Sequence, residues 1–255
     1  MSENSTVTAC CLIIGNEVLS GRTKDANLGW LAERLTNMGI RMAEARVIPD
    51  VEDVIINAVN EARKQFTYVF TTGGIGPTHD DITADCIAAA FGRELEMHPE
   101  AVEIIKQREA PPEVMVSRLR MARIPVGATL IENTLNGPPG FQLENVFVMA
   151  GVPLVMQAMV GTLDKDRIKG ALPMRSRSIG ANLGESQVAA KLREIQDEHP
   201  DVDLGSYPYY RKDVYGTNLV MRGTDESELE IMLEKVRQMI VGFGGEPIVE
   251  KKVAE

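Results

Sequence analysis

The chain has 255 residues, of which 44% are hydrophobic and 25% charged, an ordinary composition for a soluble globular protein of one large domain or two. The formal net charge of −10 argues against a general nucleic-acid-binding protein, which needs a basic face. There is no long apolar run and no basic signal segment at the amino terminus, which argues against a membrane or a secreted protein. Because the three cysteines suit a reducing compartment, we expect a cytoplasmic protein.

The first part of the chain alternates strands and helices. A buried strand is predicted over residues 7–14, which are almost continuously apolar, and a helix over residues 28–38, whose apolar side chains recur at helical spacing. Between them lies a polar loop, in which Asp25 or Asn27 is a reasonable helix cap. A short strand at residues 46–48 and a further helix follow.

The next strand, residues 67–72, runs into a glycine-rich turn and then into a helix over residues 82–91. Gly73, Gly74 and Gly76 allow positive φ angles, and their lack of side chains lets a ligand approach the backbone. Such a turn, between the carboxyl end of a strand and the amino end of a helix, directs free N–H groups at an anion. The sequence therefore predicts a phosphate-bearing ligand here.

Acidic residues follow these glycines directly. Asp80 and Asp81 would repel a phosphate unless a hard cation lay between them, and Mg²⁺ binds through one or two carboxylates plus phosphate oxygens. The alternative is structural, since Thr78 and the aspartate three residues later fit a capping box. The turn matches neither a P-loop nor a dinucleotide fingerprint.

The alternation predicts right-handed crossovers and a three-layer α/β/α sandwich. Ligands bind such open sheets beyond the carboxyl ends of the strands, an edge that the loops at 15–27 and 73–81 both leave. Residues 98–123 resemble an inserted flap of two helices. Two strands follow, joined by residues 136–141, a stiff turn that either walls a pocket or joins a hairpin. Gly151 and Pro153 then begin a helix at the same edge.

A charged linker ends the first domain, which we place at residues 1–165. Residues 166–255 are predicted to form a small α+β domain in the order β-α-β-β-α. Its elements are expected at residues 173–182, 185–197, 202–209, 214–222 and 225–240. Its clustered tyrosines could stack a base, although packing at a domain interface is the favoured interpretation.

Residues 71–83, Thr-Thr-Gly-Gly-Ile-Gly-Pro-Thr-His-Asp-Asp-Ile-Thr, closely resemble the signature of the molybdopterin-binding (MoaB/Mog-like) domain. They are most similar to the CinA-like branch (competence/damage-inducible protein A), which is also similar to the amino-terminal half of eukaryotic FAD synthase. Further motifs match in order: Gly15-x-Glu17, Asp25-x-Asn27, Pro139-Gly140-Phe141 and Gly151-Val152-Pro153. The resemblance covers roughly residues 7–163, and the second domain is similar to the KH-like domain that follows this module in CinA proteins.

The resemblance implies a Mog-like sandwich with a mostly parallel sheet, in a homo-oligomer. It also implies a small phosphorylated ligand. This ligand is a nucleotide diphosphate such as ADP-ribose or FAD, which is hydrolysed with a divalent metal ion such as Mg²⁺. Alternatively, it is a molybdopterin, which is bound without hydrolysis. By the same resemblance Asp80 and Asp81 would hold the metal, and Asp81, Asp80 and Glu17 would be catalytic. The implied ligand-binding residues are Gly15, Asp25, Asn27, Thr72, Gly73, Gly74, Gly76, Pro77, Thr78, Pro139, Gly140, Gly151 and Pro153.

The sequence departs from the branch in three respects. Asn16 replaces a usual aspartate, which puts hydrolysis in question more than binding, and Ala150 replaces a usual proline. The chain ends at Glu255, without the deamidase domain of full-length CinA or the adenylyl-transferring domain of FAD synthase. We therefore expect neither nicotinamide-nucleotide deamidation nor FMN adenylylation.

Overall fold

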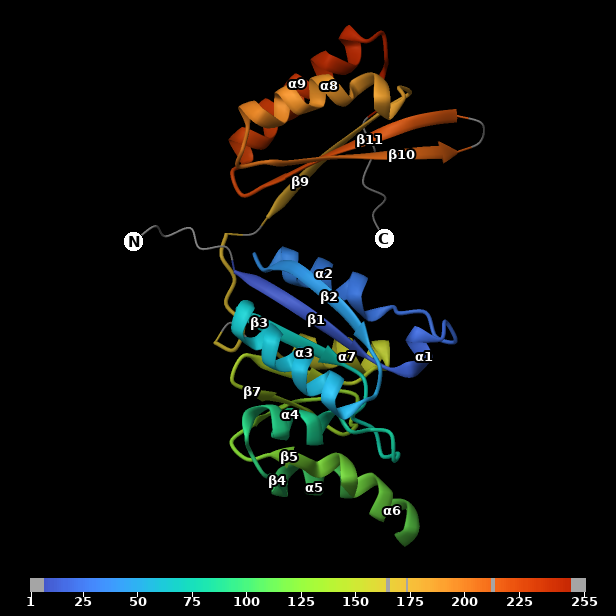
Figure 1. Cartoon of the computed structure of the whole chain (residues 1–255), viewed down its shortest axis with the longest axis vertical. Helices are drawn as coiled ribbons and strands as arrows, with labels where there is room; N and C mark the ends of the chain where they lie inside the picture. Colours follow the sequence, from blue (N-terminus) through green and yellow to red (C-terminus); the bar gives the residue numbers. More distant parts are fainter. Residues whose placement is uncertain (1–6, 164–165, 173, 212–213, 249–255) are drawn as a thin grey trace. The chain divides into compact units, whose positions relative to one another are not determined.

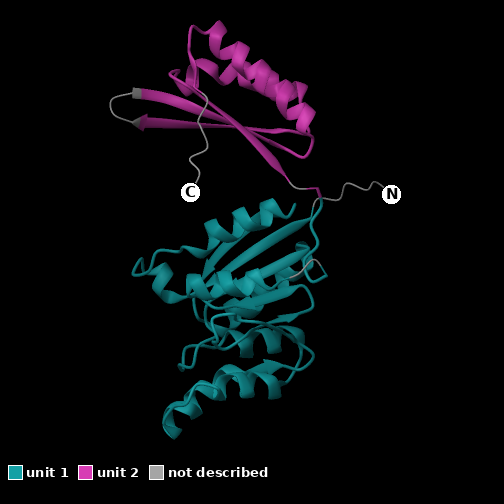
Figure 2. Cartoon of the chain, turned by 180° about the vertical axis from the view of Figure 1, so that it is seen from behind, with its two compact units in different colours: residues 1–171 teal, residues 172–255 magenta. Residues whose placement is uncertain are grey.

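A computed structural model describes residues 7–163, 166–172, 174–211 and 214–248. The chain divides into two compact units, Met1–Ala171 and Leu172–Glu255, coloured separately in Figure 2. Each unit has its own buried core. In the described part of the chain, no helix is both long and apolar enough to cross a membrane.

A six-stranded sheet forms the centre of the first unit, in the order β2-β1-β3-β8-β7-β6 (Figure 1). The parallel strands are β1 (Thr8–Ile14), β2 (Arg41–Ile48), β3 (Tyr68–Thr72) and β8 (Val146–Met149). The strands β7 (Gly140–Leu143) and β6 (Thr129–Ile131) extend the sheet antiparallel. The mostly parallel α/β class is confirmed. The sheet is mixed, because the turn at residues 136–141 leads into β7, which runs antiparallel to both of its neighbours.

Helices cover both faces of this sheet, since the side chains of each strand alternate between two cores. Leu12 and Val69 point into the core shared with α3 (Glu52–Gln65), α4 (Thr83–Phe91) and α5 (Pro99–Lys106). Ile13 and Phe70 point into the opposite core, with α2 (Asn27–Asn37) and α7 (Pro153–Gly161). The first unit is therefore a three-layer sandwich.

The inserted segment does contain two helices separated at Pro111, α5 and α6 (Pro112–Leu119). It also contains elements that the sequence pattern did not indicate. A 3₁₀ turn, η1 (Arg120–Ala122), leads into β5 (Arg123–Pro125), which pairs antiparallel with β4 (Leu95–Met97). Ala122 and Ile124 are fully buried against the core under α4, so this end of the insertion is fixed to the domain.

The second unit has a four-stranded antiparallel sheet in the order β10-β11-β9-β12, with α8 and α9 on one face (Figures 1 and 2). Its elements are β9 (Arg175–Ala181), α8 (Glu185–Glu198), β10 (Asp203–Arg211), β11 (Val214–Gly223), α9 (Glu226–Gly242) and β12 (Pro247–Ile248). The antiparallel α+β unit is thus present, with β12 as an unexpected fourth strand. Its relation to KH domains stays a prediction.

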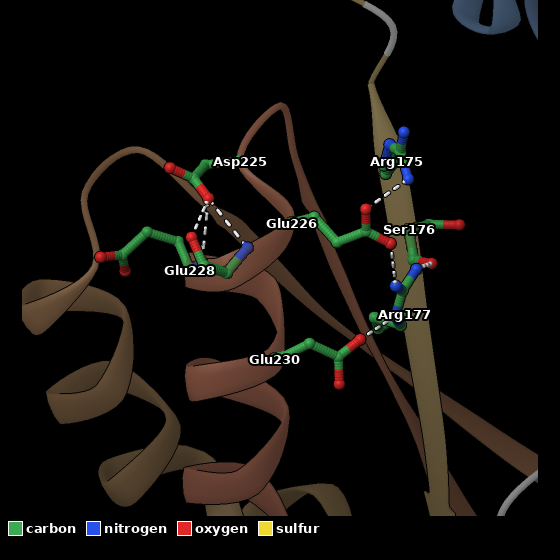
Figure 3. A network of polar contacts seen from close by, with 8 residues as sticks. Arg175, Ser176, Arg177, Asp225, Glu226, Glu228 and Glu230 are labelled. Carbon is green, nitrogen blue, oxygen red and sulfur yellow. Dashed lines mark hydrogen bonds and ion pairs between the residues drawn. The ribbon is translucent and has the colours of Figure 1, made fainter.

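An ion-pair network joins the start of α9 to β9 (Figure 3). Arg177 contacts both Glu226, at 2.8 Å, and Glu230, at 2.6 Å, while Arg175 contacts Glu226 at 2.6 Å. Asp225 caps the helix, because its carboxylate accepts hydrogen bonds from the backbone N–H groups of Ser227 and Glu228. These arginines are therefore engaged within the second unit.

Candidate functional site

Three loops meet at the carboxyl edge of the parallel strands, as the topology predicts. The side-chain amide of Asn27 donates a hydrogen bond of 2.8 Å to the carbonyl oxygen of Gly151. Gly151 in turn lies so close to Gly73 that a Cβ atom on it would be 3.2 Å from the Cα of Gly73. The backbone N–H of Gly73 donates to the carbonyl oxygen of Met149, at 3.2 Å. The loops after β1, β3 and β8 thus form one surface.

The first two glycines of the turn after β3 have no room for a side chain. At Gly73, with φ 103°, a Cβ atom would lie 2.1 Å from the carbonyl oxygen of Ile14. At Gly74, with φ 66°, it would lie 2.2 Å from Oγ1 of Thr83. Thr83 fixes the turn to α4, because its hydroxyl donates to the carbonyl oxygen of Gly73 and its N–H donates to that of Gly74, each at 3.0 Å. Tight packing therefore holds the backbone of this turn in place.

The second half of the turn is closed by Asp81. Its Oδ2 accepts hydrogen bonds from the backbone N–H of Thr78, at 2.9 Å, and from the Thr78 hydroxyl. This contact resembles a capping box, but α4 begins only at Thr83, so it closes the turn before the helix. The side chain of Asp80 is 66% exposed, and the neighbouring Thr78 side chain, followed by the backbone N–H of Asp80 itself, lowers the pKa of its carboxyl group. Asp81 is therefore beside the glycines, since a Cβ atom on Gly76 would lie 2.6 Å from its Oδ2, whereas Asp80 is exposed and does not line the hollow.

On the facing loop, Asp25 and Asn27 have different roles. Asp25 is the helix cap, since its carboxylate accepts from the N–H groups of Asn27, at 3.3 Å, and Leu28, at 2.9 Å. Asn27 instead makes the contact with Gly151. Glu17 is exposed on the short helix α1 (Asn16–Leu19), with its carboxylate folded back over Gly15.

Two buried polar atoms at this junction have no protein partner. Oδ1 of Asn27, a residue only 5% exposed, and Oγ1 of Thr72, only 1% exposed, lack a hydrogen bond within the described structure. Thr72 directly precedes Gly73, and Asn27 contacts Gly151. Because a buried polar group without a partner is costly, an ordered water would satisfy these atoms, or a ligand would do so if the loops moved apart.

A hollow opens beside the glycine turn, and part of its wall was not anticipated from the sequence. It is lined by Gly74, Ile75, Gly76, Asp81, Ala84, Asp85, Arg120, Met121, Arg123, Pro139 and Phe141. Arg123 pairs with Asp85 at 2.5 Å, whereas Arg120 comes from η1 and is exposed. The only sequence signal for these arginines was the basic run at the end of the inserted segment.

Two further residues have roles that the sequence did not predict, Gly140 and Asp50. Gly140 lies inside β7, where a Cβ atom would be 2.4 Å from the carbonyl oxygen of Val148, so its lack of a side chain serves the packing of the sheet. Asp50, after β2, accepts a hydrogen bond of 2.8 Å from the backbone N–H of Asn16 and so ties a fourth loop to the site. Among the remaining expected residues, Pro139 is buried, Pro77 is exposed, and Pro153 is the first residue of α7.

The donor set for a metal ion is small. Among the described residues there is no group of three or more histidine, cysteine, aspartate or glutamate side chains that could hold a metal. Asp80 and Asp81 nevertheless fit an ion that takes one or two carboxylates and completes its shell with phosphate oxygens and water, as Mg²⁺ does. The residues present therefore fit a metal that arrives with its ligand better than a metal held by protein alone.

Comparison with known proteins identifies the first unit. A sequence model described as "Probable molybdopterin binding domain" matches residues 10–170. The chain belongs to this molybdopterin-binding domain family. A second model, "FAD synthase, middle domain", matches residues 173–243. The glycine turn thus lies in the molybdopterin-binding domain, and the antiparallel unit matches the middle domain of FAD synthase.

Individual relatives place this molybdopterin-binding domain protein in the CinA-like branch. It is 32% identical to the solved structure of the protein CinA from Thermoplasma acidophilum, covering 64% of this chain and 100% of that one, with a TM-score of 0.58. It is 31% identical to a protein of Aeropyrum pernix over 93% of this chain and 95% of that one. It is 28% identical to a Caenorhabditis elegans protein named "Probable FAD synthase", of which it spans 50%.

Proposed function

We propose that this CinA-like protein binds a nucleotide diphosphate, of the ADP-ribose or FAD type, and hydrolyses its pyrophosphate bond with the help of a divalent metal ion. The observation that carries the proposal is the packed glycine turn, whose backbone at Gly73 and Gly74 leaves no space for side chains. The hollow beside this turn is lined by two carboxylates and two arginines, Asp81, Asp85, Arg120 and Arg123. Backbone N–H groups at the start of α4 favour an anion there.

The residues of the chain have separate parts in this proposal. Gly74 and Gly76 hold the diphosphate through their backbone N–H groups, because the N–H of Gly73 already donates to Met149. Asn27 keeps the loop of Gly151 against the turn, and its buried, unpartnered Oδ1 meets the ligand only if the loops part. Asp80 and Asp81 would hold the metal ion, which when bound would neutralise the diphosphate and lower the pKa of a water molecule. Glu17, exposed on the facing loop, would orient that water as a general base.

A second candidate function is the binding of a molybdopterin without turnover. Two observations favour it. Oδ2 of Asp81 already accepts two hydrogen bonds from Thr78, and the described residues contain no cluster of three metal-binding side chains. The asparagine at position 16, where the branch usually has aspartate, points in the same direction. The family description names molybdopterin as the ligand, which supports this second candidate.

The two functions are separated by one assay. Purified protein is incubated with ADP-ribose and with FAD, each with Mg²⁺, Mn²⁺ or Co²⁺, and the release of AMP is followed by chromatography, with EDTA as the control. The hydrolase proposal predicts AMP release that EDTA abolishes. Absence of AMP in every combination, with a folded protein, rejects it, and tight binding of a molybdopterin would then select the second function.

The homo-oligomeric state implied by the resemblance stays a prediction that light scattering tests.

A further inference from the structure

The hollow beside the glycine turn has two walls from distant parts of the chain. One wall is the turn itself, at Gly74 and Gly76, and the other is the end of the inserted segment, at Arg120 and Arg123. The volume of the hollow is about 20 Å³, room for little more than one water-sized group. It can therefore receive a phosphate oxygen, while the rest of a nucleotide must lie outside it.

Some of the charged side chains that line the hollow already have a partner in the protein. Arg123 is committed to Asp85, with Nη2 and Oδ1 at 2.5 Å. Asp81 is committed to Thr78. Arg120 also faces the hollow, and none of the ion pairs found among the described residues involves it. It is thus the cationic group of the hollow that remains for a ligand anion.

The backbone that carries Arg120 is fixed. Ala122 and Ile124 are buried in the core under α4, and the carbonyl oxygen of Ala122 accepts a hydrogen bond of 2.9 Å from the N–H of His98. The pair of Arg123 with Asp85 adds a direct link between β5 and the first turn of α4. Arg120 therefore projects from a rigid element. A rigid backbone favours binding, because less conformational entropy is lost when the ligand binds.

We infer that the inserted segment supplies the cationic half of this site: Arg120 binds a phosphate oxygen of a diphosphate seated on the glycine turn, and the Asp85–Arg123 pair holds Arg120 in register with it. A guanidinium group suits this task, because its planar fork of N–H donors matches a phosphate and never loses its charge. The inference rests on the proposed function and adds that the substrate class is recognised from both walls.

The test measures the affinity of the full chain for ADP-ribose and for inorganic pyrophosphate, each with Mg²⁺, by calorimetry. The variants are Arg120→Gln, its conservative partner Arg120→Lys, and the control Arg118→Gln, whose guanidinium donates to the carbonyl oxygen of Arg108 away from the hollow. We expect Arg120→Gln to weaken both probes by about tenfold or more, Arg120→Lys to recover part of that loss, and Arg118→Gln to change affinity by less than about twofold.

The outcomes distinguish this inference from the function on which it rests. If the wild-type chain binds both probes and Arg120→Gln binds them as tightly as Arg118→Gln does, the role of Arg120 is wrong and the proposed function stands. If the wild-type chain binds neither probe, both fall together. Melting temperatures of all variants are measured first, and we expect them to agree closely, because Arg120 is exposed and Arg118, which is half-buried, loses a single hydrogen bond to Arg108.

Discussion

The side-chain amide of Asn27 is hydrogen-bonded to the carbonyl oxygen of Gly151, although 124 positions separate the two residues. This contact joins the first turn of α2 to the loop before α7, and Gly151 is itself packed against Gly73. One side chain therefore sets the distance between the facing loop and the glycine turn. Its other polar atom, Oδ1, is buried and has no protein partner in the described structure.

Replacing Asn27 with alanine should harm binding more than stability. The variant loses one amide-to-carbonyl hydrogen bond but also removes a buried acceptor without a partner, so we expect a loss of at most about 1 kcal/mol in the free energy of unfolding. Affinity for ADP-ribose should fall by about tenfold, because the acceptor and the spacing of the loops are both lost. Chemical denaturation and calorimetry measure the two effects. Asn37→Ala, at the exposed end of the same helix, is the control, and equal affinities of the two variants would reject the role of Asn27.

Replacing Gly74 with alanine should lower the free energy of unfolding far more than replacing Gly92, although the two glycines have similar φ angles, 66° and 61°. At Gly92 the new Cβ atom meets nothing within 4 Å, so the cost is that of the left-handed backbone alone, about 1–2 kcal/mol. At Gly74 it would lie 2.2 Å from Oγ1 of Thr83, which anchors the turn. We expect Gly74→Ala to be at least about 1 kcal/mol less stable than Gly92→Ala, as measured by urea denaturation. Equal stabilities would show that the turn can relax, contrary to the packing described.

The variant Asp81→Asn separates the structural from the chemical role of this carboxylate. Asparagine keeps an oxygen that can accept from Thr78, so the loss of stability should not exceed about 1 kcal/mol, while the release of AMP from ADP-ribose should cease. Asp197→Asn, an exposed residue on α8, is the control for a lost surface charge. If Asp81→Asn unfolds readily but its folded fraction keeps full activity, then Asp81 only closes the turn.

The three cysteines should be inert in the folded protein and should lower its stability at high pH. Burial raises the pKa of the Cys10 thiol to about 11 and those of Cys11 and Cys86 to about 12, from 9.0. Because the unfolded chain ionises first, the native state holds more protons between pH 9 and about 12, and stability falls as pH rises through that window. We expect a falling melting temperature above pH 9 and no iodoacetamide labelling at pH 8 without denaturant. Rapid labelling of the native protein at pH 8 would contradict the burial of these thiols.

The elements that position the site were readable from the sequence for physical reasons. The strand β1 is almost continuously apolar, and β3 consists of β-branched and aromatic residues. The glycines after β3 indicate a turn, and Gly73 and Gly74 there have the positive φ angles that favour glycine. The rule that parallel strands gather their carboxyl ends at one edge then sufficed to bring residues 15–27 and 73–81 together.

What the sequence missed depends on tertiary packing or on very short elements. The strand β7 has four residues and begins within the Pro139–Gly140 turn, so no alternating pattern could develop. Arg120 and Arg123 reach the hollow only because Ala122 and Ile124 are buried under α4, a contact between segments far apart in the chain. Likewise, the hydrogen bond between Asp50 and Asn16 follows from the pairing of β1 with β2, which the sequence pattern does not show.

The central claim is that the glycine turn, formed by Gly73, Gly74 and Gly76, binds a diphosphate. Its most direct test is an NMR titration of ¹⁵N-labelled protein with ADP-ribose and Mg²⁺, which follows the amide resonances of these three glycines against those of α9 in the other unit. We predict saturable shifts at the three glycines, with α9 unchanged. Saturable binding that leaves the three glycine resonances where they were, or no binding at millimolar ADP-ribose, would contradict the claim.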